Sequence, residues 1–220
     1  MAKFGLVTEG ITDQIVIENI LCGFYKDYDD LDEDIHPLAP PRDETDMKQA
    51  YNEFGTGWSA VFNYISEKRF RDDVLNSEYV VIQIDTDIAE SFGCSLNQSI
   101  EEIVDTVKQK LIEQIDSKEE FYQNNKDKII FAISVHSLEC WILPIYESSK
   151  NEKIIGCADK LKYAISNSSS KKIKKLNTEK TYPNYDKLTQ DFLKYKKLME
   201  VVSKNSSFQI FISSLPSDIG

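Results

Sequence analysis

Apolar residues in the first two thirds of the chain fall into two kinds of segment. Short, nearly continuous apolar runs predict strands buried on both faces of a parallel sheet. These runs lie at residues 3–7, 79–84 and 128–135, with a weaker strand at residues 35–38. Between them, apolar residues recur at helical spacing, at residues 12–25, 58–75, 99–115 and 137–146, where Thr12 is a plausible N-cap of the first helix. Strands alternating with helices predict an α/β fold with a mainly parallel sheet flanked by helices.

The last third of the chain has a different composition. It predicts a Ser- and Lys-rich loop or frayed helix end at residues 166–175, a Lys-rich helix at 186–204 and a short helix or strand at 206–215. Residues 150–220 hold 14 Lys and Arg against seven Asp and Glu, a net charge of +7, whereas residues 1–149 carry −18. We therefore expect a domain over residues 1–149 and a basic helical extension over residues 150–220 packed on it. The asymmetry fits a basic binding face, and it fits equally well two ordinary solvated surfaces.

Composition narrows the compartment and the metal chemistry. No stretch approaches the roughly 20 apolar residues that span a bilayer, and the N-terminus lacks the pattern of a signal peptide, so we expect a cytoplasmic protein with no membrane partner. The four cysteines lie apart without a Cys-x-x-Cys pair, so we expect free, mostly buried thiols rather than a zinc site. With only two histidines, any metal site must be built from carboxylates, which favours Mg²⁺ or Mn²⁺.

Acidic residues follow three of the predicted strands. Glu9 comes after the first strand, Asp85 and Asp87 come after the middle strand, and Glu139 follows the third by a few residues. Ligand sites of open α/β sheets lie at those strand ends. Carboxylates that meet there repel one another unless a cation lies among them, and Mg²⁺ or Mn²⁺ with oxygen ligands is suited to phosphoryl-transfer chemistry.

Three motifs, in order, resemble the Toprim family. Residues 7–13, VTEGITD, resemble the Toprim opening, and residues 80–87, VVIQIDTD, resemble the Toprim strand that ends in Asp-x-Asp. Residues 134–143, SVHSLECWIL, are similar to the Glu-x-Trp helix of the OLD-like (overcoming lysogenization defect) branch of Toprim nucleases. The three motifs occur in order, each with its acid just past an apolar strand, and the resemblance covers residues 3–146 well and the tail loosely.

The resemblance implies a Toprim-like (Rossmann-like) domain and a role for each acid. Glu9 would be a metal ligand or the general acid/base, Asp85 and Asp87 would hold the ion, and Glu139 would complete the site or bind a second ion. Asp13 is a further candidate ligand, although an acid that caps the first helical turn accounts for it equally well.

Lysines cluster in two places in the extension and are candidates for contacts to a nucleic-acid backbone, with a solvated helix face as the alternative. They are Lys171, Lys172, Lys174, Lys175, Lys196 and Lys197. His136 could donate to a phosphate, although a structural histidine at a strand end is the commoner role. The turn at residues 55–57 precedes a helix and could cradle a phosphate, but it lacks the lysine and spacing of a P-loop.

These observations favour a Mg²⁺- or Mn²⁺-dependent endonuclease acting on DNA or RNA. The resemblance implies a role in bacterial anti-phage defence beside a separate ABC/SMC-like ATPase subunit, since this chain contains no Walker motif. The alternative is a non-catalytic Toprim-like regulatory subunit that binds metal and nucleic acid. The sequence leaves the oligomeric state open, with a homodimer among the options.

Overall fold

A computed structural model of the chain describes residues 2–43, 50, 53–87, 90, 95, 97–148 and 155–219. The described part contains a four-stranded sheet, with the order β2-β1-β3-β4 and every pair of neighbours parallel. The strands are β1 (Ala2–Val7), β2 (Ile35–Ala39), β3 (Ser77–Asp85) and β4 (Ile129–Ser134). The predicted α/β class with a parallel sheet is confirmed, and the arrangement is Rossmann-like.

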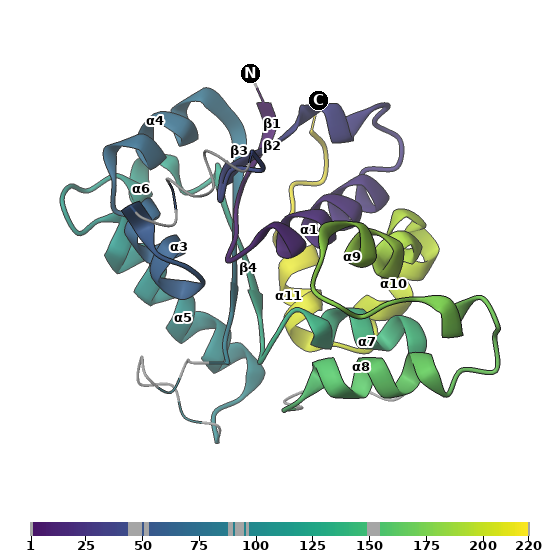
Figure 1. Ribbon diagram of the computed structural model, residues 1–220. Coiled ribbons are helices and arrows are strands. Elements are labelled where there is room, and N and C mark those ends of the chain that lie inside the picture. The colour runs from purple at the N-terminus through teal and green to yellow at the C-terminus, as the bar shows by residue number, and fades with distance from the viewer. Residues whose placement is uncertain are drawn as a thin grey trace.

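Helices cover both faces of the sheet (Figure 1). One face carries α3 (Trp58–Ile65), α4 (Lys68–Asn76), α5 (Ile100–Ile115) and α6 (Tyr122–Asn125). The other side carries α1 (Ile11–Phe24), α7 (Glu139–Tyr146), α8 (Cys157–Ser166), α9 (Tyr182–Thr189), α10 (Tyr195–Val202) and α11 (Ser206–Ser214). Short 3-10 helices lie at η1 (Leu31–Asp34), η3 (Ile173–Lys175) and η4 (Gln190–Leu193).

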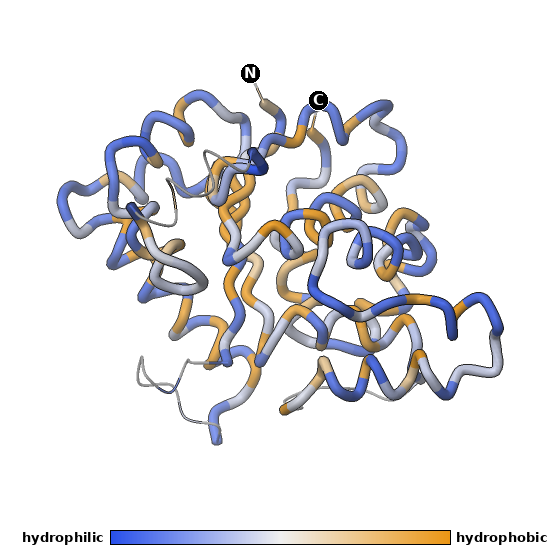
Figure 2. Tube along the Cα trace, in the orientation of Figure 1, coloured by the Kyte–Doolittle hydropathy of each residue, from blue (hydrophilic) through white to orange (hydrophobic). Residues whose placement is uncertain are grey.

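Alternate strand residues supply two hydrophobic cores, one on each face of the sheet. Val81 of β3 belongs to the core on the α1 side, whereas Val80 and Ile82 belong to the core on the α5 side. The strands therefore form an apolar band through the middle of the molecule (Figure 2). Trp141 and Phe208 also belong to the core on the α1 side, so the last third of the chain shares a core with the strands.

Three predicted helices differ in the structure. α1 begins at Ile11 with Gly10 as its N-cap, so the predicted capping role of Thr12 is wrong. The predicted helix at residues 58–75 is two helices, α3 and α4, because Arg71 donates hydrogen bonds to the carbonyl groups at the break between them.

The predicted Lys-rich helix at residues 186–204 is divided into α9, η4 and α10. The η4 backbone packs so closely on α1 that a Cβ at Gly23 would lie 1.8 Å from the carbonyl oxygen of Phe192. This contact turns Phe192 into the core, where it is fully buried. The segment at residues 206–215, for which helix and strand were both open, is the helix α11.

Cys140 and Cys157 form a disulfide, which corrects the prediction of free thiols. The bond joins the first turn of α7 to the start of α8 across 17 positions of sequence. Cysteine spacing could not reveal it, because four cysteines allow three fully paired arrangements and no spacing signal selects one. Cys22 is a free, partly buried thiol, as predicted, and Cys94 lies outside the described residues.

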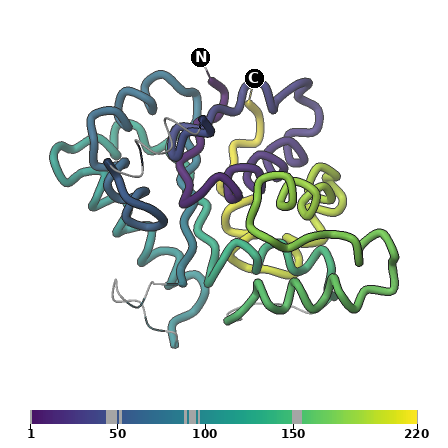
Figure 3. Tube along the Cα trace, viewed as in Figure 1, coloured from purple at the N-terminus to yellow at the C-terminus, as the bar shows by residue number. Residues whose placement is uncertain are grey.

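The two ends of the described chain lie side by side (Figure 3). The Lys3 ammonium donates a hydrogen bond to the carbonyl oxygen of Ile219, which joins the first strand to the last residues. Over the described ranges, no helix combines the length and the apolar character needed to cross a membrane.

Candidate active site

β1 and β3 are the two central strands, and the chain leaves them in opposite directions across the sheet. It runs from β1 to the edge strand β2 and from β3 to the other edge strand, β4. Ligands of open parallel sheets bind at the carboxyl ends of strands that flank such a switch point. Glu9 lies just after β1 and Asp85 ends β3, so both predicted acids lie there. The backbone N–H of Asp85 donates a hydrogen bond of 2.6 Å to Glu9 Oε1 and joins the two strand ends.

Asp85 is held in place by two polar side chains that the sequence analysis did not identify. Ser134 Oγ, at the end of β4, donates to Asp85 Oδ1 at 2.5 Å, and Gln83 Nε2 donates to the same oxygen at 3.0 Å. Gln83 also accepts a hydrogen bond of 3.4 Å from the backbone N–H of Glu9, and its side chain is fully buried. The available signal was that Gln83 is the one amide in the apolar run from Tyr79 to Ile84.

Asp13 lies in the first turn of α1, which begins two residues after Glu9. Its carboxylate folds back over Gly10, where an added Cβ would lie 3.2 Å from Asp13 Oδ2. Gly10 therefore leaves room for the carboxylate at the strand end. The charges of Asp13 and Glu9 influence each other, which places Asp13 in the acidic cluster as well as at the helix start.

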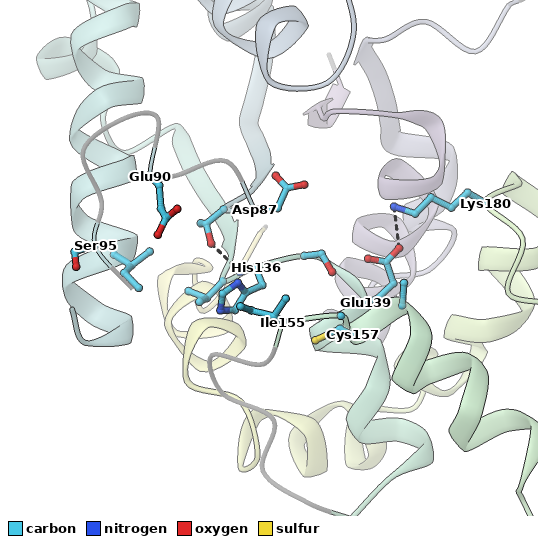
Figure 4. Close-up of a pocket in the computed structure, with 14 residues that line it drawn as sticks. Asp87, Glu90, Ser95, His136, Glu139, Ile155, Cys157 and Lys180 are labelled. Atoms are coloured by element: carbon cyan, nitrogen blue, oxygen red, sulfur yellow. Dashed lines mark hydrogen bonds and ion pairs between the residues drawn. The ribbon is translucent and has the colours of Figure 1, made fainter. Parts of the chain in front are cut away.

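Glu139 begins α7 and is nearly fully buried, with 3 % of its surface exposed. The Tyr185 hydroxyl donates to Glu139 Oε1 at 2.6 Å, and the Lys180 ammonium forms an ion pair with the same oxygen at 2.9 Å. Lys180 belongs to the segment that precedes α9, so the last third of the chain supplies a cation to the site (Figure 4). Lys180 could not be identified from the sequence, since it lies apart from the two lysine clusters and no motif marks it.

Burial and mutual repulsion disturb the titration of three acids. Burial raises the pKa of Glu9 to about 7, and the charges of Asp13 and Asp87 act in the same direction. Burial raises the pKa of Asp13 to about 7 as well, with the charge of Glu139 adding to the effect. The pKa of Asp85 lies well above its ordinary range, first because of burial and then because of the charges of Asp13 and Glu9. Ionisation of all three acids at once is therefore unfavourable in the metal-free protein.

Glu139 and Lys180 behave as an ion pair within this cluster. Burial raises the pKa of Glu139, but the Lys180 charge and the hydrogen bond from Tyr185 outweigh it, so the pKa is lowered. Burial lowers the pKa of Lys180, but the charge of Glu139 and that of Asp13 outweigh it, so the pKa is raised. Glu139 is therefore held ionised and Lys180 protonated, and each stabilises the charge of the other.

Asp87 lies two residues beyond β3 and is exposed. Its charge reaches Glu9, and its side chain lines the same cavity as Glu139 and Lys180. All five acids that the sequence analysis proposed therefore lie around the ends of β1, β3 and β4, although Asp87 is the most peripheral. The predicted placement of the acids at these strand ends is confirmed.

The donor chemistry of the cluster fits Mg²⁺ or Mn²⁺, because its acidic side chains offer only carboxylate oxygens. The raised pKa values of Glu9, Asp13 and Asp85 fit as well, since a cation among them would relieve their repulsion. As the described side chains are placed, however, no group of three or more His, Cys, Asp or Glu is arranged to hold a metal ion. Metal ligation would therefore require these side chains to move, and Lys180 already supplies a positive charge to the cluster through its ion pair with Glu139.

The two lysine clusters lie apart from the acids. Lys171, Lys172, Lys174 and Lys175 are exposed on and beside η3, in the connection between α8 and α9 at the edge of the molecule (Figure 1). Lys196 and Lys197 are exposed at the start of α10, and Lys197 forms an ion pair of 2.9 Å with Glu200. That pairing favours a solvated helix face at Lys197.

The turn before α3 lies beside the acids. A Cβ added at Gly57 would lie 3.5 Å from Glu9 Oε2, which places the start of α3 next to the carboxylate at the end of β1. Gly57 has a φ of 59° in the left-handed region, so glycine is favoured there. The predicted phosphate-binding role of residues 55–57 remains a prediction, now next to the site.

A cavity of about 350 Å³ adjoins the cluster. Glu139 and Lys180 lie on one side of it, Glu90 and Ser95 lie on the other, and His136 lies between them (Figure 4). His136 follows β4, as the sequence predicts, and its backbone N–H donates to Thr86 Oγ1 at 2.7 Å.

Comparison of this chain with models of known protein families, with curated proteins and with solved structures finds no match.

Proposed function

We propose that this chain is a Mg²⁺- or Mn²⁺-dependent nuclease that hydrolyses phosphodiester bonds in DNA or RNA. The observation that carries the proposal is the convergence of Glu9, Asp13 and Asp85 with the buried Glu139 at the switch point of a parallel sheet. Carboxylate oxygens that meet at such a place suit a hard divalent cation, and phosphodiester cleavage is a reaction that such cations support.

Each acid has a part in holding the metal. Its ligands would be drawn from Glu9, Asp13, Asp85, Asp87 and Glu139, and the bound ion would polarise the phosphodiester and activate water. Ser134 and Gln83 fix the orientation of Asp85 through its Oδ1 atom. The hydrogen bond from the Asp85 backbone to Glu9 Oε1 keeps the two strand ends in register.

Lys180 supplies a second kind of electrostatic support. Its ammonium lies 2.9 Å from Glu139, and 60 % of its side chain is exposed, so it can also reach a phosphate that enters from solvent. A positive charge positioned where negative charge develops on the phosphoryl oxygens stabilises the transition state. Lys180 is therefore assigned to the phosphate, with Glu139 as the residue that positions it.

The motif order supports a place in the Toprim family, within the OLD-like branch. On that basis the nuclease would act in anti-phage defence with a separate ABC/SMC-like ATPase subunit. The exposed lysines of the last third would contact the nucleic-acid backbone outside the site. They are Lys171, Lys172, Lys174, Lys175, Lys196 and Lys197.

The test is cleavage of a mixed panel of single- and double-stranded DNA and RNA, in Mg²⁺, in Mn²⁺ and in EDTA. Wild type should cut at least one substrate, only with metal, and Asp85→Asn should abolish cutting. Asp72→Asn is the matched control, because Asp72 is an exposed acid on α4, away from the site. Cleavage that persists in EDTA, or an Asp85→Asn variant as active as wild type, would overturn the proposal.

The alternative is a regulatory subunit that binds nucleic acid without cutting it. The observation that favours it is the ion pair between Lys180 and Glu139, which already places a cation among the acids. In that case Mg²⁺ should bind without supporting cleavage, and Lys180→Met should weaken nucleic-acid binding. Metal-dependent cleavage by purified wild type would exclude this alternative.

A further inference from the structure

The cavity beside the acids is larger and less polar than phosphate chemistry requires. Asp87, Glu139 and Lys180 line both the cavity and the acidic cluster, while much of the remaining lining is apolar, with Val135 and Ile155 among it. A metal ion and a phosphodiester need charged and polar partners, so neither accounts for an apolar cavity next to them. The part of the substrate that enters here must be different from its phosphate.

Two side chains from separate segments lie in the middle of the cavity (Figure 4). His136 has a φ of 69°, a left-handed conformation that is uncommon outside glycine, and its hydrogen bond to Thr86 fixes this turn. Ile155 precedes α8 and is 71 % exposed, which is unusual for a large apolar side chain. An imidazole ring and a branched apolar side chain offer surfaces on which a flat aromatic group can pack.

The charges around the cavity favour a neutral occupant. Asp87, Glu90 and Glu139 line it with Lys180 as a counter-charge, so a second phosphate would meet an excess of negative charge. The neutral, flat and largely apolar part of a nucleotide is its base. The cavity volume of about 350 Å³ lies within the range of roughly 300–1,000 Å³ that is typical of small-molecule sites, so a group of this size fits.

A disulfide links the cavity wall that contains Ile155 to the helix that begins at Glu139. Cys157 lines the cavity two residues after Ile155, and its disulfide to Cys140 joins it to the residue that follows Glu139. The cavity wall and the acid therefore keep a fixed spacing. A group bound against this wall would hold an adjacent phosphate in a defined position relative to Glu139 and Lys180.

We propose that the cavity receives the nucleobase next to the scissile phosphate, so that the substrate is DNA or RNA in which this nucleotide is unpaired. The inference rests on the proposed nuclease function. A base inside a duplex is held by pairing and stacking, and it reaches a separate cavity only after it leaves the helix. Single strands, loops and bulges should therefore be cut, and continuous duplexes should be spared.

The first experiment compares substrates of one sequence. DNA and RNA oligonucleotides are presented as single strands, as full duplexes and as duplexes with one bulged nucleotide, and cleavage sites are mapped. Rates for single-stranded and bulged substrates should exceed those for the duplex by on the order of tenfold or more, in keeping with the cost of removing a base from its stack. An abasic nucleotide is then placed at each position flanking the mapped phosphate.

The second experiment blocks the cavity without touching the acids. Ala158 lines the cavity in the first turn of α8 and is exposed, so Ala158→Phe should fill the space without disturbing the core. This variant should cut an intact strand on the order of tenfold more slowly than wild type does. On the abasic strand, the variant and wild type should have the same rate. Ile155→Ala should weaken binding of the intact strand. Tyr163→Ala is the matched control, because Tyr163 is also 71 % exposed and lies on α8 outside this cavity.

The outcomes separate the two proposals. If wild type cuts nothing in Mg²⁺ or Mn²⁺, the nuclease function fails and this inference fails with it. If wild type cuts duplex and single strand equally, the nuclease function stands and the base-binding role is wrong. An Ala158→Phe variant that slows cleavage of intact and abasic strands to the same extent would also overturn it, because the substitution would then act on the acids.

Discussion

Replacing Glu9 with glutamine should stabilise the metal-free protein at alkaline pH. The pKa of Glu9 is raised from 4.5 to about 7 by burial and by neighbouring acids. The native state therefore binds more protons than the unfolded state between about pH 4.5 and 7, so stability falls as the pH rises through this window. A shift of this size corresponds to about 3 kcal/mol, and glutamine keeps an oxygen for the hydrogen bond from the Asp85 backbone. We expect Glu9→Gln to gain roughly 1–3 kcal/mol at pH 8.5 and less than about 1 kcal/mol at pH 5.

Urea unfolding in EDTA at the two pH values measures this difference. Glu113→Gln is the control, because Glu113 is an exposed acid paired with Lys110 and should change stability by less than about 0.5 kcal/mol. Excess Mg²⁺ should stabilise wild type at pH 8.5 more than it stabilises Glu9→Gln, since the variant lacks one carboxylate ligand. If Glu9→Gln is no more stable than wild type at pH 8.5, or gains as much stability at pH 5 as at pH 8.5, the idea that ionised Glu9 destabilises the metal-free fold is refuted.

Four further predictions address other parts of the site. Lys180→Met should lower metal-dependent cleavage on the order of 100-fold while changing KM little, as expected for a charge that acts mainly in the transition state, and an unchanged kcat would assign Lys180 to structure alone. Cys157→Ser should lower the free energy of unfolding by about 3 kcal/mol relative to the oxidised wild type, as expected for a loop of this length. Reducing the wild type with a dithiol should have the same effect. Equal stability of all three forms would show that the disulfide contributes nothing. Charge reversal at Lys171, Lys172, Lys174 and Lys175 should weaken nucleic-acid binding and make that binding less dependent on salt. An unchanged slope of log K against log salt would show that these lysines contact only solvent. Mn²⁺ and Mg²⁺ should both support cleavage. Ca²⁺ should inhibit cleavage competitively, because Ca²⁺ binds the same oxygen ligands but in a looser geometry. Robust activity with Zn²⁺ alone would speak against a carboxylate site.

The strands and the placement of the acids could be predicted because they depend on local patterns. A run such as Tyr79 to Ile84 is typical of a strand buried on both faces, and parallel strands bring their carboxyl ends to one edge of the sheet. Glu9 and Asp85 were therefore expected at the same edge of the sheet, and the pairing of β1 with β3 brings them close together. The position of a residue that directly follows a strand is determined by that strand. The site was therefore more predictable than the helix boundaries.

The parts that could not be predicted depend on contacts between distant segments. Lys180 reaches Glu139 only because the connection before α9 passes back across the sheet ends, and no local pattern encodes that path. The division of the Lys-rich segment into α9, η4 and α10 arises from the close approach of Phe192 to Gly23. The pairing of Cys140 with Cys157 likewise arises from the packing of α8 on α7.

Whether the five acids form a metal site is tested by direct binding of Mn²⁺ to the purified protein. Free Mn²⁺ can be followed by its electron paramagnetic resonance signal while purified protein is titrated at pH 8. We expect at least one bound ion per chain in wild type and in the surface control Asp72→Asn, and much weaker binding in Asp85→Asn, because Asp85 lies at the centre of the carboxylate cluster. A wild-type protein that leaves Mn²⁺ free at millimolar concentration, or an Asp85→Asn variant that binds it as tightly as wild type, would contradict the claim that these acids form a metal site.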